Sequence, residues 1–396
     1  MANRHTSLPK NFPTLYRRLE EIILGNSGED EFEEIINLLV IKLTSTQPPS
    51  LVQDADKALQ VIAERWPGVI SSPCVKLTQE QYSKAMEALS SLTLLNEDLE
   101  SIDAVFEYVV NRKKKGDKGQ FFTPRNVVDF CINSMNLTNA ASVADPAAGS
   151  GGFIYRAAKV VDESCKLWAF DFDEIAVRTA KLLMHVSKTE NYTIKNVNSL
   201  RKPSTQTPFP ESNVDTTVIE DYLRMLGGPS SFDAILTNPP FAGEVNDADI
   251  LCGYDLAKIK SRAERDLLFI ERCLDLLKPG GRLSIILPDS VFGRASNIGV
   301  RNWILSKARV IGVIGLPRET FMPHTSVKTS ILFLEKRSCP RVEDERIFFA
   351  ISEKVGKDSR GNQIFRENNG LQELDDDFAE IEEKFEQFRH EEGVNW

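Results

Sequence analysis

A short apolar segment followed by a glycine-rich turn places the strongest constraint on the fold of this chain. Residues 141–161 run from an apolar, strand-like segment that ends at Asp145, through Gly149 and Gly151, into a stretch of helical composition. A strand, a glycine turn and a helix in this order predict the opening of a doubly wound α/β sheet. A dinucleotide-binding turn would need a third glycine where Ile154 stands, so a pyrophosphate ligand is disfavoured.

Acidic residues at the ends of two predicted strands indicate the kind of ligand that this turn would hold. Asp145 can accept a hydrogen bond from an ammonium group such as that of a methionine moiety. Twenty residues beyond Gly151, the apolar run 167–170 ends at Asp171, which is where an acidic residue binds two ribose hydroxyls. A nucleoside without phosphates therefore fits the pattern, although a glycine turn taken alone is more often an ordinary loop.

A second motif, Asn238-Pro239-Pro240-Phe241, follows the apolar, strand-like run 232–236. Two consecutive prolines cannot donate to a sheet, and each extends the residue before it, so the predicted strand ends at Asn238. The Asn238 side-chain oxygen and the Pro239 carbonyl can accept both N–H bonds of a planar amine, while Phe241 offers a stacking face. The motif predicts methylation of an amino group. The alternative is a turn that is merely punctuated by prolines.

The chemistry expected of such a site is direct displacement on a methyl sulfonium, without a covalent nucleophile or a metal. Cytosine C5 methylation requires a thiol nucleophile, and no cysteine lies beside the proline pair. The six cysteines form no close pairs and the four histidines are scattered. Neither a zinc site nor a disulfide framework is therefore predicted.

Three motifs in a fixed order resemble a known family. Residues 119–124 (GQFFTP), 145–153 (DPAAGSGGF) and 238–241 (NPPF) are similar to motifs of the gamma-class N6-adenine DNA methyltransferases. More narrowly, they resemble the modification subunits of type I restriction-modification systems. The resemblance covers roughly residues 95–390. Further matching stretches are residues 266–274, 278–292, 315–321, 327–334 and 355–361.

The resemblance implies a Rossmann-like class I methyltransferase fold with a doubly wound, mostly parallel sheet. It also implies transfer of a methyl group from S-adenosyl-L-methionine to the N6 amino group of adenine in DNA. The target adenine would leave the duplex before it reacts. The implied catalytic residues are Asn238, Pro239, Pro240 and Phe241, and the implied cofactor-binding residues are Gln120, Phe121, Thr123, Pro124, Asp145, Ala147, Gly149, Gly151, Asp171 and Asn198.

The resemblance also assigns these residues to parts of S-adenosylmethionine. Phe121, Thr123 and Pro124 would close over the methionine end. Asp145 and the two glycines would hold its amino acid portion. Asn198 would lie near the adenine ring, where the family usually has an aspartate, and its amide can still accept a hydrogen bond from the cofactor's amino group.

The charge of the chain argues against a free-standing DNA-binding protein. The formal net charge is −10, whereas nonspecific affinity for DNA comes mainly from Lys and Arg. A dense basic run, residues 112–118, can follow a phosphate backbone or form a solvated loop. No zinc finger, helix-turn-helix or long base-reading insertion is recognisable, so we expect a separate specificity subunit to recognise the double-stranded DNA. Association with a restriction subunit and self-association are left open.

The start of the sequence and the length of its apolar runs indicate where in the cell the protein is expected. Residues 1–10 contain no apolar signal core, and no apolar run approaches the ~18 residues that span a bilayer. We therefore expect a cytoplasmic protein that does not bind membranes.

Length and patterning predict three zones. Residues 1–110 are expected to form an N-terminal helical domain, because apolar residues between Phe32 and Leu43 recur at steps of three and four. Residues 111–338 alternate strand-like runs with helical segments and are expected to form the catalytic domain. Residues 339–396 are expected to form a strand and a C-terminal helical tail.

An apolar stripe marks the expected tail. It consists of Leu374, Phe378, Ile381, Phe385 and Phe388. Packing of this stripe on the enzyme's own body is the favoured interpretation, because a coiled coil would need about three or more heptads. A docking helix for a partner is the alternative.

Two other kinds of function stay open. A Pro-Pro pair followed by an aromatic residue also suits methylation of a protein glutamine or of an RNA adenine. The chain could also be a non-catalytic scaffold subunit that binds the cofactor, although the presence of Asn238 and Phe241 argues against that.

Overall fold

The computed structural model describes residues 11–24, 31–45, 47–92, 99–113, 122–203, 218–228, 231–241, 243–260, 263–341, 344–368 and 370–394. The chain divides into two compact units. The helical unit comprises residues 1–116 and 178–189, and the sheet unit comprises residues 117–177 and 190–396.

The helical unit contains the predicted run of N-terminal helices. They are α1 (Phe12–Leu24), α2 (Glu31–Thr44), α3 (Val52–Arg65), α4 (Gln79–Ser90) and α5 (Leu99–Lys113). The apolar stripe predicted between Phe32 and Leu43 lies on α2 and is buried. Thr78 and Gln81 form a capping box at the start of α4, in which each side chain accepts a hydrogen bond from the backbone N–H of the other residue.

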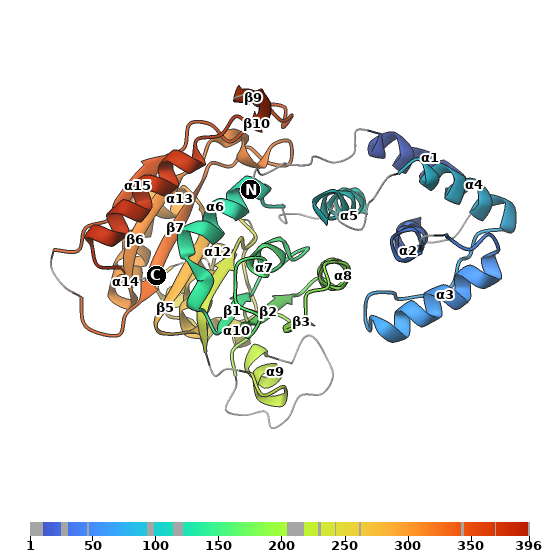
Figure 1. Ribbon diagram of the computed structural model, residues 1–396. Helices are drawn as coiled ribbons and strands as arrows, with labels where there is room; N and C mark the ends of the chain where they lie inside the picture. Colours follow the sequence, from blue (N-terminus) through green and yellow to red (C-terminus); the bar gives the residue numbers. More distant parts are fainter. Residues whose placement is uncertain are drawn as a thin grey trace. The chain divides into compact units, whose positions relative to one another are not determined.

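The sheet unit is built around one large sheet. Its strands are β1 (Ser142–Asp145), β2 (Lys166–Asp171), β3 (Tyr192–Asn196), β4 (Phe232–Thr237), β5 (Leu277–Pro288), β6 (Ala308–Gly315), β7 (Thr329–Lys336) and β8 (Phe348–Ile351). Their spatial order is β3-β2-β1-β4-β5-β7-β6-β8 (Figure 1). Neighbouring strands are parallel, except that β7 runs antiparallel to β5 and β6. The predicted doubly wound, mostly parallel sheet is confirmed.

The remaining helices and short helical turns lie before, between and after these strands in the sequence. They are α6 (Arg125–Met135), η1 (Leu137–Asn139), α7 (Gly152–Ala157), α8 (Glu174–Val186), α9 (Ile219–Met225), α10 (Ala248–Leu251), α11 (Asp255–Ile259), α12 (Arg265–Leu276), α13 (Ser290–Gly293), η2 (Ala295–Asn297), α14 (Ile298–Lys307), η3 (Arg318–Phe321) and α15 (Phe378–Glu391). A separate hairpin is formed by β9 (Phe365–Asn368) and β10 (Leu371–Leu374).

Helices cover the sheet on both faces. Buried residues of α9, α11, α12 and α14, such as Ile270, join Leu332 and Leu334 of β7 in one core cluster. Phe333 lies between those two leucines in sequence and packs instead against Phe130 of α6. Successive residues of a strand point to opposite faces, so β7 supplies apolar side chains to both layers.

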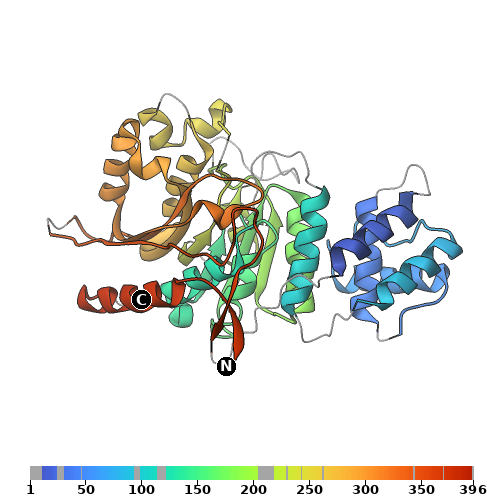
Figure 2. The ribbon, with the colours of Figure 1, turned by 90° about the horizontal axis from the view of Figure 1, so that it is seen from above.

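Residues 339–394, for which a strand and a C-terminal helical tail were expected, are grouped with the sheet unit. Strand β8 extends the sheet beyond β6. Helix α15 lies next to α6 (Figures 1 and 2). The apolar face of the sheet near β7 and β8 is therefore covered by a helix of the same chain.

The apolar stripe of α15 is the cover of that face. The ring centroid of Phe385 lies 4.9 Å from that of Phe333 and 5.2 Å from that of Phe348. Phe378, Ile381 and Phe385 are buried, as the favoured interpretation of the stripe required. The partner-docking interpretation does not hold for these three residues, because their side chains are already engaged. Leu374 is part of β10 and not of the helix.

Two further observations concern residues 204–217 and the character of the helices. Residues 204–217 lie outside the described residues, and α9 follows them. Within the described part of the chain, no helix combines the length and the apolar character that crossing a membrane requires.

The packing of α15 makes Phe385→Ala a test of the fold. Removing this fully buried ring should lower the free energy of unfolding by about 3–5 kcal/mol, because a cavity is left between α15 and the sheet. Phe349→Ala is a matched control, because Phe349 lies on β8 with 71% of its surface exposed and should change stability by about 0.5 kcal/mol or less. Urea unfolding measures both. Equal losses in the two variants would contradict the packing of α15 on the sheet.

Candidate functional site

The strand order reverses between β1 and β4, and this point defines the candidate site. Strands β2 and β3 lie on one side of β1, while β4 and β5 lie on the other side. Connections that leave in opposite directions open a crevice at the carboxyl ends of the two central strands, where ligands of such sheets bind. Asp145 ends β1, and Asn238 directly follows β4.

A buried hydrogen bond joins the ends of these two strands. The Thr237 hydroxyl donates to Oδ1 of Asp145 at 2.7 Å, and the backbone N–H of Ala147 donates to the same oxygen at 3.0 Å. Thr237 is fully buried and immediately precedes Asn238. The bond therefore sets the position of the Asn238 motif relative to the glycine turn that follows β1.

The Asp145 carboxyl titrates close to neutral pH. Burial raises its pKa to about 7, and the negative charge of Asp171 adds to the rise. The hydrogen bonds from Thr237 and Ala147 favour the ionised form and so limit the increase. A cation that approaches this carboxyl would stabilise its ionised form, which is the behaviour required of an ammonium-binding group.

The glycine turn is tied to the end of β2 by Asp171. Its Oδ2 accepts a hydrogen bond from the N–H of Gly149 at 2.8 Å, and its Oδ1 accepts one from the N–H of Asp173 at 2.8 Å. Gly149 and Gly151 have positive φ angles of 54° and 89°, which glycine adopts without strain. A Cβ placed on Gly149 would meet no atom of the chain within 4 Å, so the turn presents open space at this point.

Asn198 lies on the same edge of the sheet, just after β3. Its Oδ1 accepts a hydrogen bond from the N–H of Leu200 at 3.2 Å, which begins a tight turn. The neighbouring Asn196 donates through Nδ2 to the carbonyls of Asp171 and Phe172, at 2.9 and 2.8 Å. The chain after β3 is therefore held beside the end of β2.

The Asn238 motif is held by partners from two other segments. Nδ2 of Asn238 donates to Oγ1 of Thr123 at 2.9 Å, which joins the predicted catalytic and cofactor-binding residues. Pro239 is buried and Pro240 is half-buried. The Phe241 ring packs edge-on against Phe321, with ring centroids 5.2 Å apart and an interplanar angle of 83°.

The structure describes most of the predicted site residues. Asp145, Asp171, Asn198 and Asn238 all lie at or just after the carboxyl ends of neighbouring strands. Ala147 packs against a small cluster of buried apolar residues. Pro124 has a clear local role, because its carbonyl accepts the N–H groups of Val127 and Val128 in the first turn of α6, at 3.0 Å each. Gln120 and Phe121 lie outside the described residues.

The basic run before the first motif is only partly described. Arg112, on α5, donates to both carboxylate oxygens of Glu20 at 3.1 and 3.0 Å within the helical unit. This side chain is therefore engaged in an ion pair. Residues 114–118 lie outside the described part of the chain.

Sequence reasoning missed three residues of the site. Thr237 could have been found from the expectation that parallel strands end at one edge, because it faces Asp145 across that edge. Phe321 lies in one of the matching stretches but carried no local signal of contact with Phe241. Phe172 follows Asp171 directly, and 59% of its surface is exposed at this edge of the sheet. No cluster of metal-ligating side chains occurs among the described residues.

Comparison with protein families gives one match that covers most of the chain. The family model described as "N-6 DNA Methylase" matches residues 98–394. Similar curated proteins include the EcoEI methylase subunit of a type I restriction enzyme from Escherichia coli, with 27% identity over 59% of this chain and 46% of the relative. The StySJI methylase subunit from Salmonella typhimurium is 24% identical over 78% of this chain and 56% of the relative. The chain thus spans about half the length of these curated relatives.

Solved structures share the fold. A crystal structure described as the modification subunit of a type I restriction enzyme from Vibrio vulnificus has a TM-score of 0.62 and 18% identity, and covers 98% of this chain and 91% of that one. A structure described as a class I S-adenosylmethionine-dependent methyltransferase from Listeria monocytogenes has a TM-score of 0.59 and 19% identity, over 86% of this chain and 93% of that one. The predicted class I methyltransferase fold is confirmed.

The raised pKa of Asp145 predicts how stability depends on pH. Because the pKa is higher in the folded than in the unfolded state, the folded protein binds more protons between about pH 4 and 7, and its stability falls as pH rises through this range. Asp145→Asn cannot ionise and should lack this loss. Thermal unfolding of the cofactor-free proteins from about pH 5 to 8.5 measures the difference. Asp249→Asn, at an exposed position, is the control, and a wild-type curve parallel to that of Asp145→Asn would contradict the assignment.

Proposed function

Because the chain belongs to the N-6 DNA methylase family, we propose that it transfers a methyl group from S-adenosyl-L-methionine to the N6 amino group of adenine in DNA. One observation carries this proposal. The Thr237–Asp145 hydrogen bond holds the Asn238 motif directly beside a glycine turn that has open space at Gly149. A donor that carries an amino acid group and an acceptor amine can meet at such a point.

The residues around the turn fit S-adenosylmethionine. Asp145 would accept the ammonium group, and the open side of Gly149 would face the amino acid portion. Asp171 would bind the ribose hydroxyls through oxygen lone pairs that its two backbone contacts leave over, since each carboxylate oxygen can accept more than one bond. Phe172 and Asn198 would lie at the adenine end. The bound cofactor supplies an electrophilic methyl group.

The acceptor site follows from the Asn238 motif. The Asn238 side-chain oxygen and the Pro239 carbonyl would accept the two N–H bonds of the adenine amine, which concentrates the lone pair on its nitrogen. Thr123 accepts a hydrogen bond from the Asn238 amide nitrogen, and this bond would keep the side-chain oxygen of Asn238 for the amine. Phe241 would stack on the base, and the edge contact with Phe321 sets the plane of its ring.

We propose further that the protein is the modification subunit of a type I-like restriction-modification system, with a separate specificity subunit. The net charge of −10 supports a partner, because the chain by itself carries little excess positive charge for binding phosphates. Methylation of a protein glutamine or an RNA adenine, and a non-catalytic scaffold role, are the competing functions.

The test is direct. The protein is incubated with methyl-labelled S-adenosylmethionine and adenine-containing duplex DNA, alone and with the products of the neighbouring genes. Digestion to nucleosides followed by mass spectrometry should detect N6-methyladenine. Label in RNA or protein but not in DNA would favour the competing substrates, and cofactor binding without transfer to any of them would favour the scaffold role.

Within that assay, Asn238→Ala should separate chemistry from cofactor binding. Loss of the acceptor for the reacting amine should lower turnover at least about 100-fold, whereas the dissociation constant for S-adenosylhomocysteine should stay within about twofold. Calorimetry and single-turnover kinetics measure the two quantities. A variant that keeps wild-type turnover would remove Asn238 from the catalytic role.

A further inference from the structure

The loop that follows β3 is largely buried and is held by side chains from other segments. The 198–202 loop (Asn198 to Lys202) begins two residues after β3 ends, at the edge of the sheet where Asp171 ends β2. Its first residue is the one expected near the cofactor's adenine. The position of this loop therefore decides where one end of the cofactor pocket lies.

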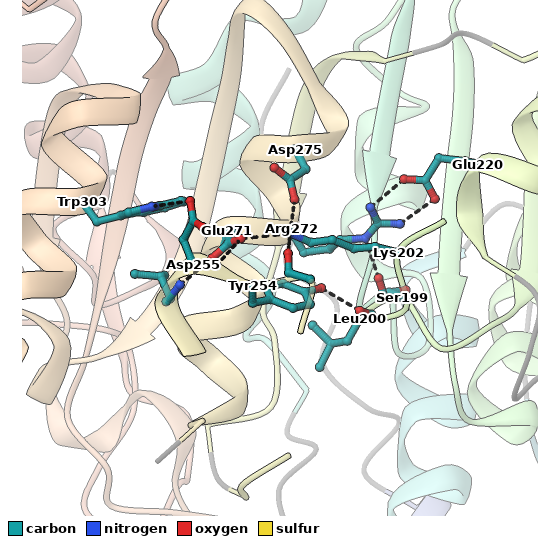
Figure 3. A network of polar contacts seen from close by, with 12 residues as sticks. Ser199, Leu200, Lys202, Glu220, Tyr254, Asp255, Glu271, Arg272, Asp275 and Trp303 are labelled. Atoms are coloured by element: carbon teal, nitrogen blue, oxygen red, sulfur yellow. Dashed lines mark hydrogen bonds and ion pairs between the residues drawn. The ribbon is translucent and has the colours of Figure 1, made fainter. Parts of the chain in front are cut away.

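Two buried side chains bind the backbone of the 198–202 loop. Nε of Arg272 donates to the carbonyl of Ser199 at 2.7 Å, and the hydroxyl of Tyr254 donates to the carbonyl of Leu200 at 2.7 Å (Figure 3). Arg272 is 1% exposed and Tyr254 is fully buried. Hydrogen bonds to carbonyls that have no water as an alternative partner restrict the loop to one conformation.

Arg272 is itself fixed in place. Its two terminal nitrogens bind the carboxylate of Glu220, on α9, at 2.6 and 2.8 Å (Figure 3). A planar guanidinium that makes a bidentate pair cannot rotate without breaking both bonds, and a buried charge without its partner would be strongly unfavourable. The nitrogen that faces Ser199 is therefore held at a fixed position.

Lys202, at the other end of the loop, is bound to the same part of the sheet unit. Its ammonium donates to Glu271 at 2.9 Å and to the carbonyl of Gly253 at 2.7 Å, and it lies 3.9 Å from the centroid of the Tyr254 ring (Figure 3). Glu271 also accepts the N–H group of Asp255 at the start of α11. Both ends of the loop are thus held against α12 and the segment around Tyr254.

That segment is also the continuation of the catalytic motif. Residues 243–254 follow Phe241 in sequence, and Asp247 within them pairs with Arg201 of the loop at 3.0 Å. Leu200 shares a small apolar cluster with Tyr254, against which Ala147 of the glycine turn packs. One cluster therefore contacts the expected adenine end, the amino acid end and the chain that leads away from the amine-accepting motif.

We propose that this cluster is a clamp for cofactor binding, and that Tyr254 is a positioning residue whose hydroxyl holds the 198–202 loop in the conformation that binds the adenosine moiety of S-adenosylmethionine. The proposal rests on the proposed function, because that function supplies the ligand. Tyr254 does not touch the cofactor. It acts through the carbonyl of Leu200, two residues from Asn198.

Tyr254→Phe tests the clamp with little disturbance, because it removes one hydroxyl and keeps the ring. Tyr82→Phe is a matched control: Tyr82 is also fully buried and its hydroxyl also donates to a backbone carbonyl, that of Pro49, at 2.8 Å, but within the helical unit. The probes are S-adenosylhomocysteine and 5′-methylthioadenosine, which lacks the amino acid portion. Isothermal titration calorimetry on the full chain gives the dissociation constants.

We expect Tyr254→Phe to weaken both ligands about five- to tenfold, because the loop then samples conformations that do not bind adenosine. Tyr82→Phe should leave both dissociation constants within about twofold, although both variants should lower the melting temperature. The methylthioadenosine result separates the adenosine end from the amino acid end.

Three outcomes would overturn the proposal. Wild-type affinity of Tyr254→Phe for both ligands would show that the hydroxyl does not position the loop. A loss confined to S-adenosylhomocysteine would place the effect at the amino acid end. A wild-type protein that binds neither ligand would refute the proposed function, and the clamp with it, whereas the first two outcomes leave the proposed function intact.

Discussion

The hydrogen bond between Thr237 and Asp145 is the contact on which the arrangement of the site depends. It forms where two parallel strands end side by side and the connections leave in opposite directions, so the two segments that follow diverge around one point. One segment is a turn with open space at Gly149, and the other begins with Asn238. A buried acceptor and a buried donor that satisfy each other fix this junction, because either group alone would be costly away from water.

Polar contacts spread from this junction to each part of the candidate site. Asp171 connects the glycine turn to β2, Asn196 connects the end of β3 to the end of β2, and Thr123 reaches Asn238 from the segment before α6. These bonds join short side chains to backbone groups or to one another, and short side chains have few alternative conformations. The proposed binding and catalytic groups are therefore preorganised by the sheet.

The C-terminal residues show that packing on the same sheet buries an apolar surface that a partner could otherwise bind. The sheet presents apolar residues on both faces, and β8 widens it beyond β6. α15 covers the face that Phe333 and Phe348 line, so its apolar stripe serves the stability of the catalytic unit. An amphipathic helix in an isolated sequence has the same pattern whether it covers its own sheet or a partner, because the pattern records only that one side avoids water.

Local chemistry determined much of this protein from the sequence alone. Backbone conformation is specified within a few residues by glycine spacing, by a pair of prolines and by acidic residues after apolar runs. The sequence therefore predicted the strand, turn and helix around Asp145, the strand end at Asn238 and the place of Asp171. The tertiary structure decided which distant groups meet. It brings Thr237 to Asp145, Phe321 to Phe241, and Arg272 and Tyr254 to the 198–202 loop. The residues in each of these contacts are 54 to 92 positions apart in the sequence. No local pattern encodes such contacts, because they arise from the order in which strands pair and from the burial that this order imposes.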